Sequence, residues 1–257
     1  MGRFDSSRTR VAPIFDRLRC IDPTGRTWLP ALLKLPSREP AVTVTIPTGD
    51  LEEACWWPEE KRLSAPVALL KWLIENATPP ESTVACGGAE TRAKREALVA
   101  KDPTRIAEAL NLVSTARDER AWYVLEGRTC PDVFLITNDT VVVIEGKRTE
   151  KGPTTITSWM SVRHQILRHM DSAVEVASTR RVIGFFVVEG DSAVVPPHWR
   201  QAALDTISPD TLAFSLPHRS DDERRTIANG FIGVTTWQAL CGALNIPSEV
   251  LIDEVVD

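Results

Sequence analysis

Three charged residues stand at the ends of two neighbouring apolar segments, and their types could perform metal-dependent chemistry. Asp132 opens the run 132–137, whereas Glu145 and Lys147 close the run 140–147. Charged groups are costly in buried strands unless they are paired or bind a metal ion. Mg²⁺ and Mn²⁺ prefer carboxylate oxygens, and a nearby ammonium group could contact a phosphate or the attacking water. The three residue types therefore point to a carboxylate-bound cation beside a lysine.

The two apolar segments are predicted to form a β-hairpin that brings these charges together. Asn-Asp at 138–139 favours a two-residue turn, because both residue types tolerate positive φ. In the resulting register Asp132 faces Glu145, and Lys147 points to the same side of the sheet. Opposed residues of an antiparallel pair have Cβ atoms ~4.5–5.5 Å apart, where like charges are destabilising. A bound cation would offset that repulsion; the alternative is an exposed hairpin end with a solvated acid pair and a lysine.

The rest of the chain predicts an α/β fold around this hairpin. We expect helices over 64–76, 89–101, 102–113, 157–178 and 196–207, strands over 121–126, 132–137, 140–147, 181–189 and 210–216, a short β-like run at 41–46, and a strand leading into a helix over 231–246. The run at 181–189 is apolar throughout, as expected for a strand covered on both faces. The order of helix, three strands, helix and strand is typical of an α/β layout.

At this point the sequence resembles the PD-(D/E)xK nuclease superfamily. The resemblance lies in Pro131-Asp132, the strand that follows, and Glu145-Gly146-Lys147. It implies a restriction-endonuclease-like core, with a central mixed sheet flanked by helices in the order αβββαβ. We place this nuclease core in residues 86–190, with an N-terminal elaboration over 1–85 that is irregular apart from one helix. Residues 191–257 are expected to form a C-terminal α/β extension of the core.

The resemblance also implies metal-dependent hydrolysis of phosphodiester bonds. Asp132 and Glu145 would bind Mg²⁺ or Mn²⁺, and Lys147 would assist the nucleophile or the transition state. The superfamily often supplies a further acid from the first core helix, for which Glu90 is the preferred candidate. Glu126, at the end of the expected strand 121–126, is another candidate metal ligand. Glu96 is the other candidate on the first core helix, and the alternative for both Glu90 and Glu96 is an ordinary solvated glutamate.

One branch of the superfamily, the RecB-like branch, carries a glutamine and a tyrosine four residues apart on the helix after the lysine. Gln165 stands in a fitting place, but His169 occupies the position where the tyrosine would be, so the chain departs from that branch. Gln165 could still order the site or contact DNA. The alternative is a polar residue on the solvated side of a helix.

Basic residues near the proposed site could contact nucleic-acid phosphates, which position a strand without reading its sequence. The net charge of the whole chain is −5, yet Lys and Arg outnumber Asp and Glu within residues 86–185. The candidates are Arg92, Lys94, Arg95, Arg148, Lys151, Arg163 and Arg168. The alternative for each of them is a solvated surface charge.

Composition and the remaining motifs exclude several other classes. The chain has 257 residues, 43% of them hydrophobic and 25% charged, enough for one large domain or a core with an elaboration. No apolar run approaches the ~20 residues that cross a bilayer, and the start lacks an apolar signal segment, so we expect a cytoplasmic protein without membrane contact. The five cysteines form no CxxC pair, which predicts reduced thiols and no structural zinc. Nucleophile-elbow, phosphate-loop and dinucleotide-binding glycine motifs are absent from the sequence.

The leading hypothesis is therefore a Mg²⁺-dependent nuclease acting on DNA, as an endo- or exodeoxyribonuclease, which could work as a homodimer. One alternative is a catalytically inactive module on the same fold that binds nucleic acid or another protein. The other is a nuclease directed at RNA.

Overall fold

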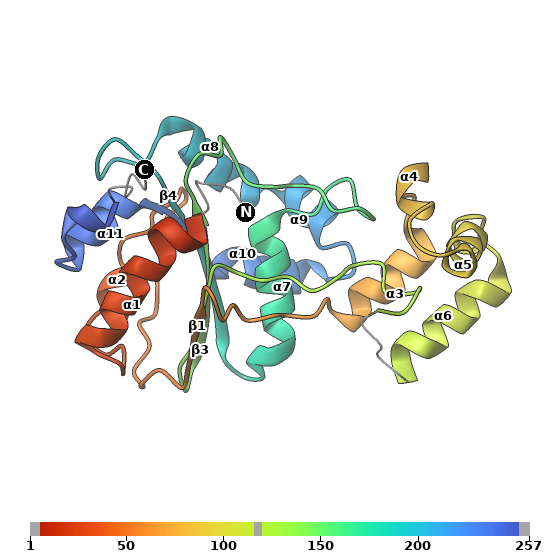
Figure 1. Cartoon of the computed structure of the whole chain (residues 1–257), viewed down its shortest axis with the longest axis horizontal. Helices are drawn as coiled ribbons and strands as arrows, with labels where there is room; N and C mark the ends of the chain where they lie inside the picture. The colour runs from red at the N-terminus through yellow and green to blue at the C-terminus, as the bar shows by residue number, and fades with distance from the viewer. Residues whose placement is uncertain (1–5, 116–119, 252–257) are drawn as a thin grey trace, which may run out of the picture.

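A five-stranded mixed sheet forms the centre of the protein, as seen in a computed structural model that describes residues 6–115 and 120–251 (Figure 1). The strands lie in the sheet in chain order: β1 (Glu53–Trp56), β2 (Val133–Ile136), β3 (Thr140–Lys147), β4 (Arg181–Val188) and β5 (Phe231–Thr236). The pairs β1–β2 and β2–β3 are antiparallel, whereas β3–β4 and β4–β5 are parallel. An α/β chain with a mixed sheet is therefore confirmed.

The β2–β3 hairpin has the predicted register. Phe134 pairs with Val143, and the backbone N–H of Thr137 donates to the carbonyl of Thr140 at 2.9 Å, which closes the two-residue turn at 138–139. The described ladder begins at Val133, one residue after Asp132. The turn residues and the alternation of the two strands thus determine which side chains meet at the far end of the hairpin.

Helices cover both faces of the sheet. The first face carries a π-helical turn η1 (Ser7–Val11) with α1 (Ala12–Ile21), α2 (Leu29–Leu32), α11 (Trp237–Ala243) and the short η2 (Ser248–Leu251). The second face carries α7 (Gln165–Ala177), α8 (Pro197–Thr206), α9 (Pro209–Ser215) and α10 (Asp221–Gly230). Side chains of β3 alternate between the two cores, Val142 toward the first face and Val143 toward the second. We call the sheet and these helices the sheet lobe.

Four more helices form a separate lobe at the far right of Figure 1. They are α3 (Val67–Asn76), α4 (Glu81–Val84), α5 (Ala89–Val99) and α6 (Pro103–Thr115), and their apolar side chains make a third core with Leu125 and Trp159. We call this part the helical lobe. No helix in residues 6–115 or 120–251 is long and apolar enough to span a bilayer.

The expected strand order αβββαβ is wrong, because the first strand of the sheet is β1 and not the segment 121–126. That segment is irregular, and its Tyr123 and Leu125 are buried in the helical lobe. Its apolar residues pack against helices, and β propensity follows from such surroundings more than from residue type. Consequently the part expected as an N-terminal elaboration, 1–85, contributes an edge strand and several core helices. The part 191–257 does extend the sheet, through β5.

Three other segments differ from their predictions. Residues 41–46 form no regular strand, although their apolar side chains pack against the first core. The helix expected over 157–178 begins only at Gln165. The strand expected over 210–216 is helix α9, where Ser208 accepts a hydrogen bond from the backbone of Thr211 and Pro209 starts the first turn. A capped start with proline at the first helical position favours a helix over an extended strand.

Candidate active site

The three predicted residues Asp132, Glu145 and Lys147 meet at one end of the β2–β3 hairpin. Glu145 and Lys147 are two positions apart on β3, so their side chains point to the same face of the sheet. Both residues are almost fully buried, with 4% and 6% of their surface exposed. Lys147 Nζ lies 2.9 Å from Glu145 Oε1. Asp132 turns its Oδ2 toward β3, where it accepts a hydrogen bond of 2.7 Å from the backbone N–H of Gly146. The sequence-based placement of these three residues in one cluster is confirmed.

Helix α7 adds two side chains that hold Glu145 and Lys147 in place. Gln165 Nε2 donates to Glu145 Oε1 at 2.6 Å, while Lys147 Nζ donates to Gln165 Oε1 at 2.9 Å. One helical turn later, His169 Nε2 lies 2.9 Å from Glu145 Oε2, and its Nδ1 lies 2.8 Å from Thr129 Oγ1. An ionised carboxylate only accepts, so Nε2 is the donor of this pair. Both oxygens of Glu145 therefore have fixed donors.

A glycine between the two functional residues allows the close approach of α11. A Cβ at Gly146 would lie 2.8 Å from Trp237 Cζ2 and 3.3 Å from Asp132 Oδ2. Carbon atoms essentially never come as close as the first of these distances without displacement of one partner. Trp237 is fully buried, and its indole N–H donates to the carbonyl of Lys147 at 3.1 Å. Glycine at 146 thus permits the packing that fixes the end of β3.

The N-terminal segment lies over the same end of the sheet. Ser7 Oγ donates to Asp132 Oδ1, Ser6 Oγ donates to the carbonyl of Gly146 at 3.0 Å, and Arg148 donates to Thr9 Oγ1 at 3.1 Å. Ser7 and Thr9 belong to the π-helical turn η1, a geometry that is often found at functional sites, and Ser6 directly precedes this turn. Nothing in the sequence pattern predicted these contacts, because they join residues more than a hundred positions apart.

The pKa of Asp132 is raised to about 7, first by burial and then by the negative charge of Glu145. Hydrogen bonds from Ser7 and Gly146 and the charge of Lys147 oppose this rise without cancelling it. Near neutral pH, Asp132 is therefore partly protonated, whereas an ordinary aspartate is fully ionised.

Glu145 and Lys147 have the opposite electrostatic balance. Burial favours neutral Glu145, but the hydrogen bond and charge of His169 and the charge of Lys147 outweigh burial, and the pKa of Glu145 lies below its ordinary value. Burial likewise disfavours charged Lys147, yet the neighbouring Glu145 carboxylate raises the pKa of its ammonium group above the ordinary value. The pair is thus a carboxylate and an ammonium ion at neutral pH.

The donor set fits a hard divalent cation with an open coordination sphere. Asp132 and Glu145 supply carboxylate oxygens. Ionised Asp132 is disfavoured by burial and by the negative charge of Glu145, and a bound cation would offset both effects. In the described ranges, no group of three or more His, Cys, Asp or Glu side chains is arranged to hold a metal ion. Mg²⁺ commonly uses only one or two carboxylates and keeps several waters. The residues therefore suit Mg²⁺ or Mn²⁺ bound partly by water or substrate and do not form a closed cage.

The structure does not bring the other two predicted acids to this cluster. Glu90 lies on α5 in the helical lobe, where its exposed carboxylate is 2.6 Å from Lys94 Nζ. Both oxygens of Glu126 instead accept hydrogen bonds from Arg163, at 3.0–3.2 Å. These positions correct the assignment of Glu90 as a catalytic residue and of both glutamates as metal ligands.

The predicted phosphate contacts separate into buried and accessible groups. Arg163 has a fully buried side chain between Glu126 and Asp171, so its prediction as a nucleic-acid contact is corrected. Arg168 is partly exposed on α7, and Lys151 is exposed. Arg148 is held by Thr9, as described above. Arg95 lies in the helical lobe, where it donates to the carbonyls of Trp122 and Cys86.

Besides Ser6 and Ser7, His169 and Thr129 were not identified as parts of the site from the sequence. His169 was noted only as a departure from a family pattern, although its position four residues after Gln165 places both on one side of α7. Thr129 comes from an irregular segment without any recognisable pattern.

Comparisons of the chain with family models, with curated proteins and with solved structures found no match.

Proposed function

We propose that this chain is a metal-dependent nuclease that hydrolyses phosphodiester bonds, with DNA as its substrate. The observation that carries the proposal is the meeting of Asp132, Glu145 and Lys147 at one end of an antiparallel hairpin, with Gln165 bridging the last two. The hairpin is followed by helix α7 and by β4, which runs parallel to β3. This arrangement is consistent with a restriction-endonuclease-like core, to which the chain would add β1 from its N-terminal part.

The proposed site works through charges held in fixed positions. A Mg²⁺ or Mn²⁺ ion, held by Asp132 and Glu145, would polarise the phosphoryl group and lower the pKa of a bound water. The ammonium group of Lys147 would contact the scissile phosphate or the attacking water and stabilise the charge that develops there. Its hydrogen bond to Gln165 and its contact with Glu145 keep the long side chain in one conformation before substrate arrives.

Gln165 and His169 act as positioning residues in this proposal. Gln165 fixes the distance between Glu145 and Lys147, because its amide contacts both. His169 keeps Glu145 ionised and is itself oriented by Thr129. Such outer contacts commonly decide the orientation of carboxylates that bind metals.

One observation favours a second candidate, an inactive module that binds nucleic acid or a protein on the same fold. Ser7 donates to Asp132, and both oxygens of Glu145 are engaged by protein donors. In an inactive module these hydrogen bonds would be permanent. In a nuclease the Ser7 contact would be replaced when the cation and substrate bind.

A cleavage assay over a panel of substrates tests the proposal. Supercoiled plasmid and labelled single- and double-stranded DNA and RNA are incubated with Mg²⁺, Mn²⁺ or EDTA, with wild type and the variant Lys147→Ala. Lys71→Ala, at an exposed lysine of α3, is the matched control. We expect cleavage of DNA only with metal, normal activity of Lys71→Ala, and a loss of about 10²–10³-fold in Lys147→Ala, the usual effect of removing one preorganised charged donor. Binding of nucleic acid without cleavage under every condition would favour the inactive module, and selective cleavage of RNA would reassign the substrate.

A further inference from the structure

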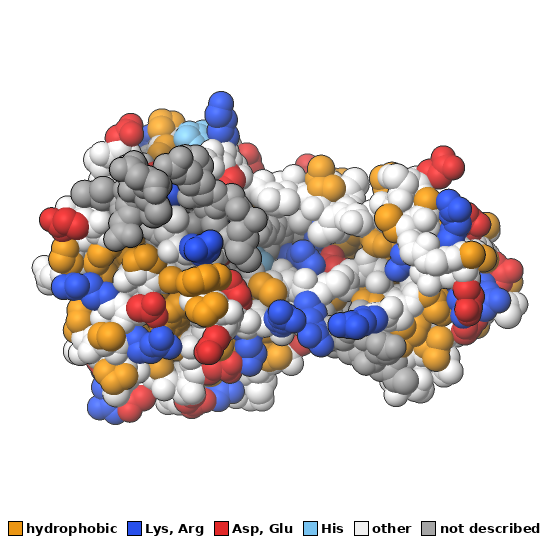
Figure 2. All heavy atoms as spheres, viewed as in Figure 1, with side chains coloured by type: hydrophobic (Ala, Val, Ile, Leu, Met, Phe, Trp, Pro, Cys, Tyr) orange, Lys and Arg blue, Asp and Glu red, His pale blue; other side chains and the backbone are white. Residues whose placement is uncertain are grey.

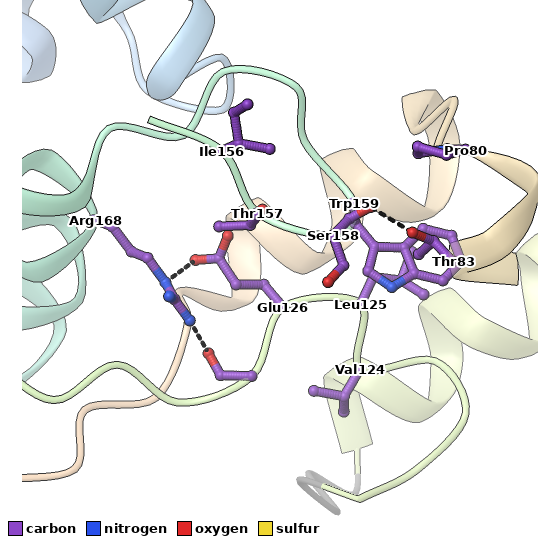
Figure 3. Close-up of a pocket in the computed structure, with 11 residues that line it drawn as sticks. Pro80, Thr83, Val124, Leu125, Glu126, Ile156, Thr157, Ser158, Trp159 and Arg168 are labelled. Atoms are coloured by element: carbon purple, nitrogen blue, oxygen red, sulfur yellow. Dashed lines mark hydrogen bonds and ion pairs between the residues drawn. The ribbon is translucent and has the colours of Figure 1, made fainter. Parts of the chain in front are cut away.

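A pocket of about 660 Å³ lies between the sheet lobe and the helical lobe (Figure 3). Thr83 of α4 borders it on the helical side, and Arg168 of α7 borders it on the sheet side. The segments 124–127 and 156–159 complete its walls, and Thr83 Oγ1 donates to the carbonyl of Ser158 at 3.1 Å. The pocket is therefore formed by segments from both lobes.

This pocket adjoins the candidate active site through shared segments. Arg168 lies on α7 between Gln165 and His169, which both contact Glu145. The guanidinium group of Arg168 donates to the carbonyl of Gly127 at 2.9 Å, and Figure 3 shows its ion pair with Glu126, in which Nε and Oε1 are 3.3 Å apart. Two residues after Gly127, Thr129 is hydrogen-bonded to His169. The pocket wall and the candidate site therefore share helix α7 and the segment 127–129.

Arg168 and Glu126 form an ion pair in the pocket wall, so the positive charge available to a ligand lies at the margin of the pocket. Figure 2 shows Lys and Arg side chains along the waist between the two lobes. Arg62, Arg128 and Arg168 all lie near enough to Cys130 to act electrostatically on its thiol, with Glu60 opposing them. An antiparallel bridge between Leu63 and Thr129 holds the first two arginines on neighbouring segments. Positive charge at the margin of the pocket is complementary to a negatively charged phosphate backbone.

The size and lining of the pocket favour one strand over two. Ligand pockets of about 300–1,000 Å³ accommodate one small molecule, so this pocket has room for a nucleotide of a single strand but not for a duplex. Ile156 is 65% exposed at the pocket, whereas Trp159 is only 7% exposed and packs in the core of the helical lobe. Unpaired bases expose apolar faces that can pack on Ile156, whereas paired bases are stacked on each other.

We propose that the pocket between the lobes, bordered by Ile156, Trp159 and Arg168, binds an unpaired segment of nucleic acid and leads its backbone to Asp132 and Glu145. The substrate class is then nucleic acid with a single-stranded segment, such as a free strand or a tailed duplex. This inference rests on the proposed nuclease function, but its binding step can be measured separately.

The test measures binding by the full chain with fluorescence anisotropy in EDTA, which prevents metal-dependent cleavage. The probes are a labelled single strand, a blunt duplex of the same sequence, and that duplex with a single-stranded tail. Ile156→Glu and Arg62→Glu place negative charge at the pocket and at its basic margin, both at exposed positions. Val194→Glu, also 65% exposed, and Arg225→Glu on α10 are the matched controls.

We expect single-stranded and tailed probes to bind about tenfold more tightly than the blunt duplex, and each pocket variant to lose about tenfold in that affinity. Arg62→Glu should also make the slope of log K against log salt concentration shallower, by the amount expected for the loss of about one phosphate contact or more. The two controls should bind as wild type does. Equal binding of the blunt duplex, or pocket variants that bind as well as the controls, would overturn the inference.

Cleavage of the same probes with Mg²⁺ separates this inference from the proposed function. Cleavage of blunt and tailed probes at one rate, unaffected by Ile156→Glu, overturns the pocket assignment and leaves the nuclease. Selective binding of the single strand without cleavage supports the pocket and refutes the nuclease.

Discussion

Replacing Asp132 by asparagine should stabilise the metal-free protein at alkaline pH. The carboxyl group is buried beside Glu145, which raises its pKa from 3.8 to about 7. A carboxyl group that holds its proton more tightly in the folded state than in the unfolded state stabilises the fold at low pH, and this contribution is lost as pH rises from about 4 to about 7. Asparagine has nearly the same shape but never ionises.

The size of the effect follows from the pKa. Each tenfold change in acid dissociation is worth about 1.4 kcal/mol, so the full rise would amount to about 4 kcal/mol. Asp132 keeps partial contact with solvent, which screens its charge. We therefore expect Asp132→Asn to raise the free energy of unfolding by about 2–4 kcal/mol at pH 8 and by almost nothing at pH 4.

Urea unfolding in EDTA at pH 4 and pH 8 measures this difference. Asp191→Asn, at an exposed loop position, is the control and should change stability little at either pH. Adding Mg²⁺ at pH 8 should reduce the advantage of Asp132→Asn, because the cation stabilises the wild-type carboxylate and not the amide. The reasoning is refuted if Asp132→Asn is no more stable than wild type at pH 8 in EDTA.

Three further perturbations follow from individual contacts. Gly146→Ala should lower the free energy of unfolding by about 1–3 kcal/mol, because its Cβ would meet Trp237 at 2.8 Å; an unchanged urea midpoint would contradict this packing. Arg163→Ala should cost about 3–5 kcal/mol, since it leaves Glu126 and Asp171 buried without their shared partner, whereas Arg225→Ala should have little effect in the same urea titration. His169→Ala should raise the pKa of Glu145, so the acidic limb of the pH–rate profile should move to higher pH; a lower rate with an unmoved profile would limit His169 to a structural role.

The part of the site on the hairpin was predictable from sequence because its information is local. Asn-Asp at 138–139 determines the turn, and strand alternation then places Glu145 and Lys147 on one face opposite Asp132. The spacing of Gln165 and His169 carries similar local information, since residues four apart share a helix face.

The remaining contacts depend on long-range packing that no local pattern contains. Strand β1 has only four residues, and all four helices of the helical lobe lie between β1 and its partner β2 in the sequence. The segment 121–126 has strand-like composition, yet its apolar side chains enter the helical core. Glu126 is an example of such a long-range contact. Its carboxylate is buried against Arg163, and this ion pair forms only in the folded protein.

The central claim is that the two carboxylates of the hairpin support metal-dependent cleavage, and the most direct measurement is the single-turnover rate of DNA cleavage during a Mg²⁺ titration. Wild type is compared with Glu145→Gln, which preserves side-chain size, and with Glu75→Gln at an exposed position of α3. Circular dichroism confirms that the variants are folded. The account predicts that Glu75→Gln matches wild type and that folded Glu145→Gln is slower by at least about 10²–10³-fold at every Mg²⁺ concentration. A folded Glu145→Gln that cleaves DNA as fast as wild type at the same Mg²⁺ concentration would contradict it.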